Sequence, residues 1–440
     1  MLAAGGGIDK WWAMFNIHDD DAVRDILERH RIGNVKDYVP QPVVSLEDQW
    51  AAEPTRADGL RVLNSRPFNA ETPEAALREY ITPTELFFVR GHMPVPDLKN
   101  RPDFCVMVEG EGMDARCFTV EDLKRQFEEH TETVTIQCGG NRRTTMEAAY
   151  AADGAKGVKG LSWKGGAIGT ADWTGVYLRD VIAACQVEPP YDPASYHVQF
   201  EGADRDAAGH FQASIPYNMA TSPDADVLIA YKMNGEDLPP DHGYPLRAIV
   251  PGVVGVRNCK FLQRVTVQPD ECESVWQQND YKNFPSYETK PNHSYPSIYY
   301  MPVQSQLTHA AYNPEADAIQ LQAYAYAGGG RGIQRVEVSH DNGRSFEYAA
   351  TLQPRPQTGA ASQEEASFPH ERQWAWRQVV ADTPVKDIKA APVVRGDGTK
   401  VYLTCIRAVT TDNEVQPAVA PYNFRGLLYN GYSCKDIAVK

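Results

Sequence analysis

Long apolar runs, an excess of basic residues and internal repeats are all missing from this sequence. A helix that crosses a membrane needs about 20 consecutive apolar residues. No run approaches that length, so we expect a soluble protein without a membrane span. The formal net charge is −15, which argues against nucleic acid as a partner because a phosphate backbone requires a basic face. An anionic substrate would therefore have to be attracted by a local basic pocket.

The cysteines form neither a C-x-x-C pair nor a tight cluster, which argues against a metal-binding or redox motif built from neighbouring thiols. The eight of them are scattered along the chain: Cys105, Cys117, Cys138, Cys185, Cys259, Cys272, Cys405 and Cys434. This distribution suits reduced thiols better than a disulfide framework, although it is compatible with an oxidising compartment.

The chain is long enough, at 440 residues, for about three domains of ordinary size. Composition shifts divide it into residues 1–40, an acidic linker rich in Ala and Pro at 41–59, and two larger domains at 60–295 and 296–440. Residues 60–295 mix β-rich and helical runs, so we predict an α+β domain. The expected strands are Phe104–Glu109, Thr133–Gln137 and His197–Phe200, and the expected helices are Thr119–Glu129 and Thr174–Cys185.

Residues 296–440 instead alternate apolar and polar residues, which predicts an antiparallel sandwich of immunoglobulin type. The expected strands are Leu321–Ala327, Gln334–Ser339, Arg372–Val379 and Lys400–Ala408. Asp341-Asn342-Gly343 is a good hairpin turn, and Gly328–Gly330 and Gln357–Ser367 are expected loops.

The most informative stretch runs from Thr135 to Arg143, where Cys138 follows an apolar strand end and precedes two glycines. Glycines without Cβ atoms allow a tight turn and close approach. The guanidinium groups of Arg142 and Arg143 would favour a thiolate and attract anions. Such a thiolate can hold a soft metal beside an oxyanion pocket. The alternative for a lone cysteine is a buried structural residue.

Further motifs occur in order on both sides of this stretch. They are Arg66-Pro67-Phe68-Asn69-Ala70, Phe87-Phe88-Val89-Arg90-Gly91-His92, Lys159-Gly160-Leu161-Ser162-Trp163, Phe200-Glu201-Gly202-Ala203-Asp204, Asp241-His242-Gly243-Tyr244-Pro245-Leu246-Arg247, Arg257-Asn258-Cys259-Lys260, Trp276–Lys282 and Asn423-Phe424-Arg425-Gly426. Together they resemble the sulfite oxidase family over roughly residues 60–430. The resemblance implies a molybdopterin-binding domain followed by an immunoglobulin-like dimerisation domain, and hence a homodimer.

The same resemblance implies a molybdenum–molybdopterin cofactor and the oxidation of sulfite to sulfate. Cys138 would be the protein's molybdenum ligand. The pterin contacts would be Phe88, Arg90, His92, Asp204, His242, Arg247, Arg257 and Lys260, where cations meet the phosphate. The anion pocket would comprise Arg90, Arg143, Trp163, Tyr281 and Arg425, with Lys159 near the oxo groups.

Each of these residues also has an ordinary interpretation, such as a surface charge for a lone arginine, a structural histidine, or a core position for Trp163. These residues occur together and in the order that the family has, which favours the interpretation of each as a site residue. One position departs from the pattern, because the family usually has Asn where this chain has Gly91. The change removes a side-chain hydrogen-bonding group from the pterin site.

The N-terminal stretch, including Trp11–His18 and Val23–Gly33, resembles the C-terminal half of a cytochrome b5 domain. His18 stands where that domain has its second axial haem ligand. The His-Pro-Gly-Gly motif that would supply the other ligand is not found in the sequence, so we do not expect haem b. Residues 1–40 are therefore interpreted as the remnant of a truncated haem domain, with an amphipathic arm as the alternative.

Two other functions remain to be distinguished from sulfite oxidation. A nitrate reductase would share the fold and the cysteine, but it typically carries Met at the position of Arg425. A catalytically silent dimer is the other alternative. The electron acceptor would be cytochrome c or another acceptor. The chain ends without a peroxisomal Ser-Lys-Leu, and the haem-domain remnant favours the mitochondrial intermembrane space.

Overall fold

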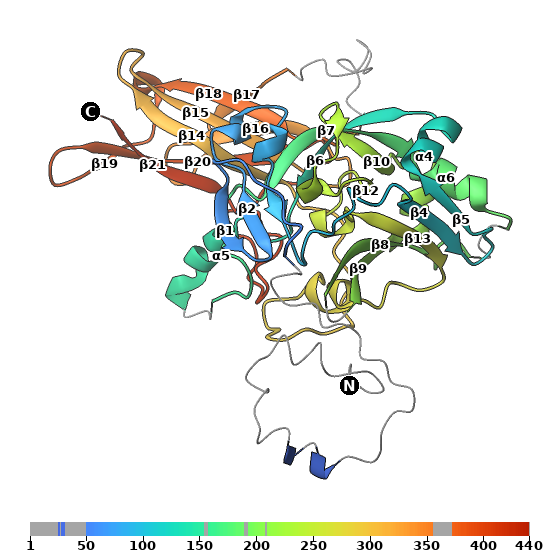
Figure 1. The fold of residues 1–440 in the computed structure, drawn as a ribbon. Coiled ribbons are helices and arrows are strands. Elements are labelled where there is room, and N and C mark those ends of the chain that lie inside the picture. The colour runs from blue at the N-terminus through green and yellow to red at the C-terminus, as the bar shows by residue number, and fades with distance from the viewer. Residues whose placement is uncertain are drawn as a thin grey trace.

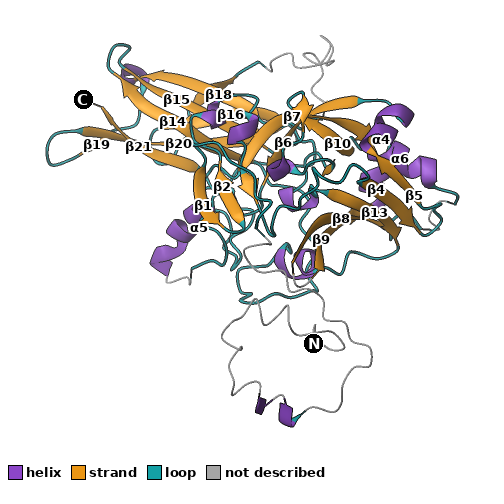
Figure 2. Cartoon of the chain, in the orientation of Figure 1, coloured by secondary structure: helices purple, strands orange, loops and turns teal. Residues whose placement is uncertain are grey.

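The computed structural model describes residues 25–26, 28–30, 50–153, 157–188, 192–206, 209–354 and 372–439. His18, most of the predicted haem-domain remnant and the predicted loop Gln357–Ser367 lie outside these residues. The described residues form a mixed helix-and-sheet body joined to a second body made mainly of strands (Figures 1 and 2). This confirms the predicted fold class. Within the described residues, no helix has the length and apolar character needed to cross a membrane.

The first body contains three sheets. A small one consists of β1 (Arg61–Ser65), β2 (Phe68–Glu71) and β3 (Val89–Arg90). A second has the order β11 (Glu236–Asp237), β10 (Leu228–Met233), β7 (Ile168–Tyr177) and β6 (His130–Gln137), with β12 (Arg247–Ile249) also paired to β10. The third has the order β5 (Arg116–Thr119), β4 (Cys105–Gly110), β13 (Leu262–Gln268), β8 (His197–Asp206) and β9 (Gly209–Pro216).

Short helices connect these strands, and all are shorter than a typical globular helix. They are α4 (Val120–Gln126), α5 (Arg143–Tyr150), α6 (Leu178–Cys185) and α7 (Tyr217–Thr221), with a π-helical turn at Trp276–Asp280. Helix α6 packs on the core through Leu178, Val181, Ile182 and Cys185, which recur at helical spacing. The predicted helix Thr174–Cys185 was wrong in its first turn, because residues 174–177 extend β7 and pair with β10.

The second body is one strongly curled sheet. Its strands follow the order β14 (Gln304–Asn313), β15 (Ala318–Tyr326), β18 (Arg377–Pro384), β17 (Tyr348–Leu352), β16 (Ile333–Ser339), β20 (Lys400–Thr410) and β19 (Val393–Val394), with β21 (Ser433–Val439) paired to β20. Because β14 also lies against β20 and β21, the sheet folds into two layers over an apolar core (Figure 1). The Asp341–Gly343 turn joins two antiparallel strands as predicted. The strand expected at Arg372–Val379 begins only at Arg377.

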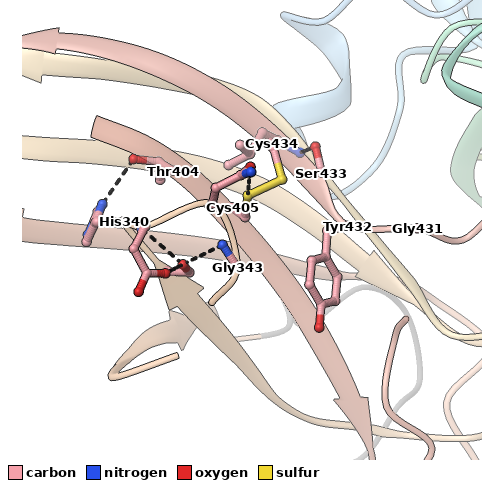
Figure 3. Close-up of a disulfide and its surroundings, with 12 residues drawn as sticks. His340, Gly343, Thr404, Cys405, Gly431, Tyr432, Ser433 and Cys434 are labelled. Carbon is pink, nitrogen blue, oxygen red and sulfur yellow. Dashed lines mark hydrogen bonds between the residues drawn. A yellow bond between two sulfur atoms is a disulfide. The ribbon is translucent and has the colours of Figure 1, made fainter. Parts of the chain in front are cut away.

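Two disulfides correct the prediction of reduced thiols. Cys405 and Cys434 stand directly opposite each other on β20 and β21 and are bonded (Figure 3). Cys105 and Cys117 are bonded between the antiparallel strands β4 and β5. The pairs are 29 and 12 residues apart in sequence, so only the strand register brings them together. Cys138, Cys185, Cys259 and Cys272 are free and buried.

The strand that leads to Cys138 rests on the second body. Trp376 donates its backbone N–H to Thr135 Oγ1 at 2.8 Å, and its indole donates to Tyr80 O at 2.9 Å. Tyr324 stacks on Trp376 with ring centroids 5.2 Å apart. Gln304 donates to the side chain of Gln137, the last residue of β6. The second body therefore holds in place the end of the strand from which Cys138 emerges.

Candidate active site

A cavity lies at the end of β6, beside Cys138. Most of the residues that the family resemblance implicated line it. These are Phe88, Arg90, His92, Cys138, Asp204, His242, Arg247, Lys260 and Tyr281. They come from segments that are far apart in the sequence, so the fold is what brings them together.

Cys138 follows β6 immediately and is only 6% exposed. Its N–H donates to Ala167 O at 2.9 Å, and its carbonyl accepts the N–H of Asn141 at 3.0 Å, which closes the predicted tight turn. A Cβ atom on Gly140 would lie 2.4 Å from Nη2 of Arg143. Glycine is therefore required at that position if Arg143 is to lie beside the cysteine turn.

Arg143 is buried and held by backbone carbonyls. Its Nε donates to Arg425 O at 3.1 Å and its Nη1 donates to Leu161 O at 2.6 Å. Burial lowers the pKa of Arg143, while the nearby Cys138 and Tyr281 raise it. Gly160 and Gly426 both have positive φ, and a Cβ atom on either would lie within 3 Å of the Arg143 side chain. The glycines of these motifs thus make room for one guanidinium group.

Arg142 does not share this position, which corrects the prediction that both arginines act on the thiol. It adopts a left-handed conformation, with φ of 64°, before α5. Its guanidinium group donates to Gly431 O at 2.7 Å, Tyr432 O at 2.9 Å and Ser305 O at 3.2 Å. Arg142 is therefore a buried link to the second body.

Arg425 lies next to Arg143 through its backbone carbonyl. Its Nη2 atom is 3.1 Å from Asp280 Oδ1, and its buried Nε has no hydrogen-bond partner among the described residues. Asp280 precedes Tyr281, whose hydroxyl is 3.3 Å from Nε2 of His92. Burial raises the pKa of Tyr281, so its hydroxyl remains protonated at neutral pH. The sequence analysis singled out Tyr281 but did not identify Asp280 as the partner of Arg425. Both residues belong to motifs that it named, Trp276–Lys282 and Asn423–Gly426.

Arg90 is oriented by Asn69, another residue whose role the sequence did not reveal. The Oδ1 atom of Asn69 accepts from Arg90 Nη1 at 3.0 Å and from the N–H of Gly91 at 3.1 Å. A Cβ atom on Gly91 would lie 2.7 Å from Phe68 O. Gly91 stands where the family usually has Asn, and at this position the backbones of β2 and β3 approach each other closely.

The lining of the cavity also includes buried ionisable groups. Burial raises the pKa of Asp204 to about 7 and lowers those of Lys260 to about 8 and Arg247 to about 9. Burial, followed by the charge of Arg247, lowers the pKa of His242 to about 3, so this imidazole is neutral; its Nε2 lies 3.1 Å from Thr84 O. Burial also holds the pKa of His92 well below its usual value.

Two of these groups test whether the cavity fits a pterin cofactor. Asp204 Oδ1 and Arg247 Nε are buried and have no partner among the described residues. An unpaired buried polar atom costs roughly 1 to 3 kcal/mol, so the cavity is set up for a ligand that supplies both hydrogen-bond donors and negative charge. Pterin nitrogens can donate to Asp204, and a phosphate can accept from Arg247 and Lys260. The residues present therefore fit molybdopterin.

Five predicted site residues are not among those that line the cavity: Arg143 and Arg425, described above, and Trp163, Lys159 and Arg257. Trp163 is buried in a neighbouring apolar cluster, and Lys159 is exposed, with its N–H donating to Phe424 O at 2.9 Å. Arg257 is fully buried and donates to Gln277 and to Ile298 O instead. The predicted contact between Arg257 and the pterin stays a prediction. The position of Arg257 outside the cavity lining does not favour it.

Comparison with known proteins agrees with this geometry. Residues 92–276 match the oxidoreductase molybdopterin binding domain, and residues 295–440 match the Mo-co oxidoreductase dimerisation domain. The sulfite oxidase of Gallus gallus is 39% identical over 97% of this chain and 88% of its own length. The mitochondrial sulfite oxidase of Homo sapiens is 41% identical over 98% of this chain and 75% of its own.

Two further similarities are weaker. A nitrate reductase of Aspergillus niger is 34% identical over 66% of this chain but only 34% of its own length. The crystal structure of the sulfane dehydrogenase SoxCD from Paracoccus pantotrophus has the same fold, with a TM-score of 0.63 and 23% identity over 93% of this chain and 89% of that one. The near-complete match to sulfite oxidases decides the assignment. The chain belongs to the sulfite oxidase family.

Proposed function

We propose that the cavity beside Cys138 binds sulfite and that the residues around it orient sulfite for oxidation to sulfate. The protein is a molybdenum-dependent sulfite oxidase with molybdopterin as its cofactor. The observation that carries the residue assignment is that Cys138 and Tyr281 line the same cavity as the unpaired Asp204 and Arg247. Next to them, Arg143, whose pKa both Cys138 and Tyr281 raise, donates to Arg425 O at 3.1 Å.

Cys138 is assigned as the thiolate that anchors molybdenum. When bound, the molybdenum centre supplies the two-electron redox step and the oxygen atom that sulfite gains. The pterin would be held by Asp204, His242, Arg247 and Lys260, which line the same cavity as Cys138.

The substrate is a dianion, and the protein's remaining task is to hold it with sulfur facing the reacting oxygen. Arg143 and Arg425 each offer a planar fork of donors for oxyanion oxygens. Both are held before substrate arrives, Arg143 by the backbone carbonyls of Arg425 and Leu161 and Arg425 by Asp280. The protonated hydroxyl of Tyr281 can donate a further hydrogen bond to the same anion. Positioning of this kind lowers the entropic part of the barrier.

The dimerisation domain at residues 295–440 supports a homodimer. We further propose that the electrons pass to cytochrome c or another acceptor and that the protein works in the mitochondrial intermembrane space. The support for the location is that the relatives from Homo sapiens and Mus musculus are named as mitochondrial. The resemblance of residues 1–40 to a haem domain supports the acceptor.

Cys138→Ser tests the metal assignment. A hydroxyl is a poor substitute for the electron-rich thiolate, so the variant should fold, keep pterin and lose sulfite-dependent reduction of ferricyanide. Cys185→Ser is the matched control, because Cys185 is also free and buried but lies in helix α6, away from the cavity. Substantial steady-state activity in molybdenum-loaded Cys138→Ser would overturn the assignment.

The two alternative functions make different predictions in the same assay. A nitrate reductase would prefer nitrate over sulfite with artificial electron carriers. A silent dimer would bind pterin and turn over neither anion. Ferricyanide and cytochrome c, tested side by side, separate the chemistry at the cavity from the choice of acceptor.

A further inference from the structure

The π-helical turn Trp276–Asp280 presents three side chains to the active site. The ring of Trp276 packs against that of His92, with centroids 4.5 Å apart, and Asp280 pairs with Arg425 at 3.1 Å. Tyr281 follows the turn directly and lines the cavity. π-helical turns are rare and are frequently found at functional sites. The exact course of this turn therefore determines where three site groups lie.

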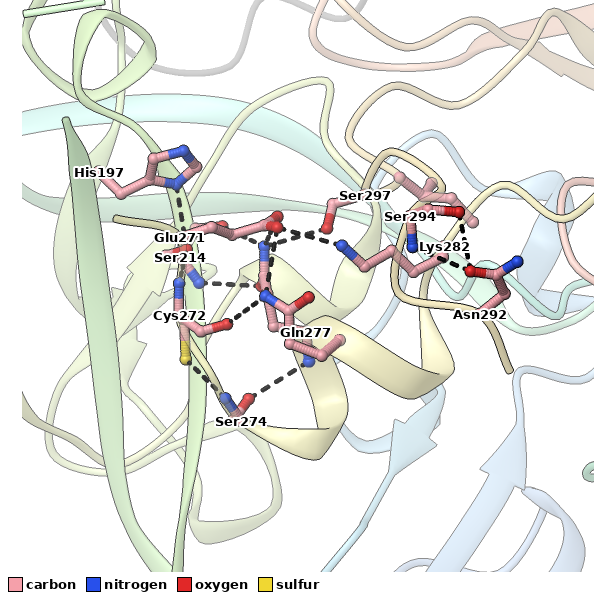
Figure 4. A network of polar contacts seen from close by, with 12 residues as sticks. His197, Ser214, Glu271, Cys272, Ser274, Gln277, Lys282, Asn292, Ser294 and Ser297 are labelled. Atoms are coloured by element: carbon pink, nitrogen blue, oxygen red, sulfur yellow. Dashed lines mark hydrogen bonds and ion pairs between the residues drawn. The ribbon is translucent and has the colours of Figure 1, made fainter. Parts of the chain in front are cut away.

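Gln277 lies on the same turn but does not line the cavity, and its side chain is fully buried. Its Oε1 accepts the N–H of Ser214 at 3.1 Å and a hydrogen bond from Nη1 of Arg257. Its Nε2 donates to Glu271 Oε1 at 2.6 Å and to Ser214 O at 3.4 Å (Figure 4). Every hydrogen-bonding direction of the amide is used, so the side chain has one orientation available.

Arg257 connects this amide to the backbone of Tyr281. Besides Gln277, its guanidinium group donates from Nε to Ile298 O at 3.3 Å. The N–H of Ile298 in turn donates to Tyr281 O at 2.8 Å. Arg257 is fully buried, and burial lowers its pKa, while the charge of Glu271 and neighbouring tyrosines raise it. Its guanidinium group thus ties the start of the π-turn to the segment around Ile298, whose N–H donates to Tyr281 O.

Lys282 fixes the chain on the other side of Tyr281. Its Nζ is 3.1 Å from Oε2 of Glu271, and its side chain is only 4% exposed (Figure 4). Burial would raise the pKa of Glu271, but hydrogen bonds from Ser297, Gln277 and Lys282 lower it to about 2, so this carboxylate is charged. Gln277, before Tyr281, and Lys282, after it, are therefore both attached to one half-buried carboxylate.

We propose that Gln277 and Arg257 are positioning residues for sulfite oxidation, which hold the π-turn so that Tyr281 and Asp280 face the anion pocket. This rests on the proposed role of Tyr281 in holding sulfite. Neither residue touches the cavity, and both are committed to the backbone that carries Tyr281. A displacement of about 1 Å in a group that orients substrate can cost on the order of a hundredfold in rate.

The test uses Gln277→Met in the cofactor-loaded dimer, since methionine fills the same space without the amide. We expect kcat/KM for sulfite per bound molybdenum to fall about ten- to a hundredfold, mainly through a higher KM. Gln278→Met is the matched control. Gln278 also donates to Glu271 and to Cys272 O, at 3.3 and 2.8 Å, but has no hydrogen bond to Arg257 or Ser214. It should stay within about threefold of wild type.

A crystal structure of each variant without cofactor gives a readout that does not depend on turnover. In Gln277→Met the hydroxyl of Tyr281 should move from its place 3.3 Å from Nε2 of His92, and in Gln278→Met it should not. If Gln277→Met does not fold, Arg257→Lys keeps the charge, removes the fork and should cause the same loss.

The proposal is overturned if kcat/KM per molybdenum stays within threefold of wild type in these variants, or if Tyr281 keeps its place in their structures. Tyr281→Phe is assayed alongside. If Tyr281→Phe leaves sulfite turnover intact, the assigned role of Tyr281 is wrong. If Tyr281→Phe lowers sulfite turnover and Gln277→Met does not, only the positioning role of Gln277 is wrong.

Discussion

Arg142 and Arg143 are neighbours in sequence, yet Arg142 donates to Gly431 O at 2.7 Å while Arg143 donates to Arg425 O at 3.1 Å. The left-handed conformation of Arg142 separates the two side chains at the start of α5. One arginine ties the cysteine turn to the second body, and the other is assigned to the anion pocket that we propose. The two positions should therefore respond to substitution in different ways.

Arg142→Met should lower stability and spare chemistry. The change removes the buried donor to the carbonyls of Ser305, Gly431 and Tyr432, of which Gly431 O keeps a hydrogen bond from Gln416 Nε2 at 2.9 Å. We expect the melting temperature to fall by roughly 5 to 10 °C, since each unpaired buried group costs on the order of 1 to 3 kcal/mol. The kcat/KM for sulfite per bound molybdenum should stay near wild type. A variant with normal melting but lost activity would place Arg142 in the site after all.

Arg56 should retain the cofactor. Its guanidinium group forms two 2.8 Å contacts with the carboxylate of Asp241, which lines the cavity, and lies 3.8 Å from the ring of Phe68. Glu53 in the same segment accepts the N–H of Val95 at 3.0 Å. The segment just before β1 thus contacts Asp241, in the lining of the cavity that we assign to the pterin.

In Arg56→Ala, the dissociation rate of pterin should rise about tenfold or more. A loss of about 1.4 kcal/mol of binding free energy corresponds to a factor of ten. Release can be followed by pterin fluorescence after dilution. Arg101→Ala is a suitable control, as Arg101 is an exposed arginine whose partner Asp103 lies 3.5 Å away on the surface. Equal release rates in all three proteins would show that the segment does not retain the cofactor.

Glu271 should make stability depend on pH in the acid range. Its pKa is about 2 in the folded protein against an ordinary 4.5, so the folded state binds fewer protons between these values. Its contribution is fully present above about pH 4.5 and is lost as the pH falls toward 2.

The measurement compares unfolding of wild type and Glu271→Gln across that range. The stability advantage of wild type should be largest above pH 4.5 and should shrink as the pH falls. An advantage that is constant across the range would mean that Glu271 is not held ionised by Lys282 and Gln277.

The sequence motifs predicted the cavity well where function depends on local geometry, as at Cys138 and its two glycines. They could not place Arg257, because its partners Gln277 and Ile298 are 20 and 41 residues away and meet it only through the π-turn. The bond between Cys405 and Cys434 was missed for a similar reason, since it depends on the register of β20 and β21. Residues 174–177 look helical in isolation, but their pairing with β10 makes them a strand.

The most direct test of the central claim is kcat/KM for sulfite and for nitrate in wild type, Arg143→Gln and Arg425→Met, assayed with the same artificial electron carriers. Loss of one charge-assisted contact is worth roughly 1.5 to 3 kcal/mol, or about ten- to a hundredfold in kcat/KM. We predict that wild type prefers sulfite, that both variants lose sulfite efficiency by that factor, and that Arg425→Met keeps or gains any trace of nitrate reduction. Unchanged sulfite turnover in both variants, or a wild type that prefers nitrate, would contradict the account.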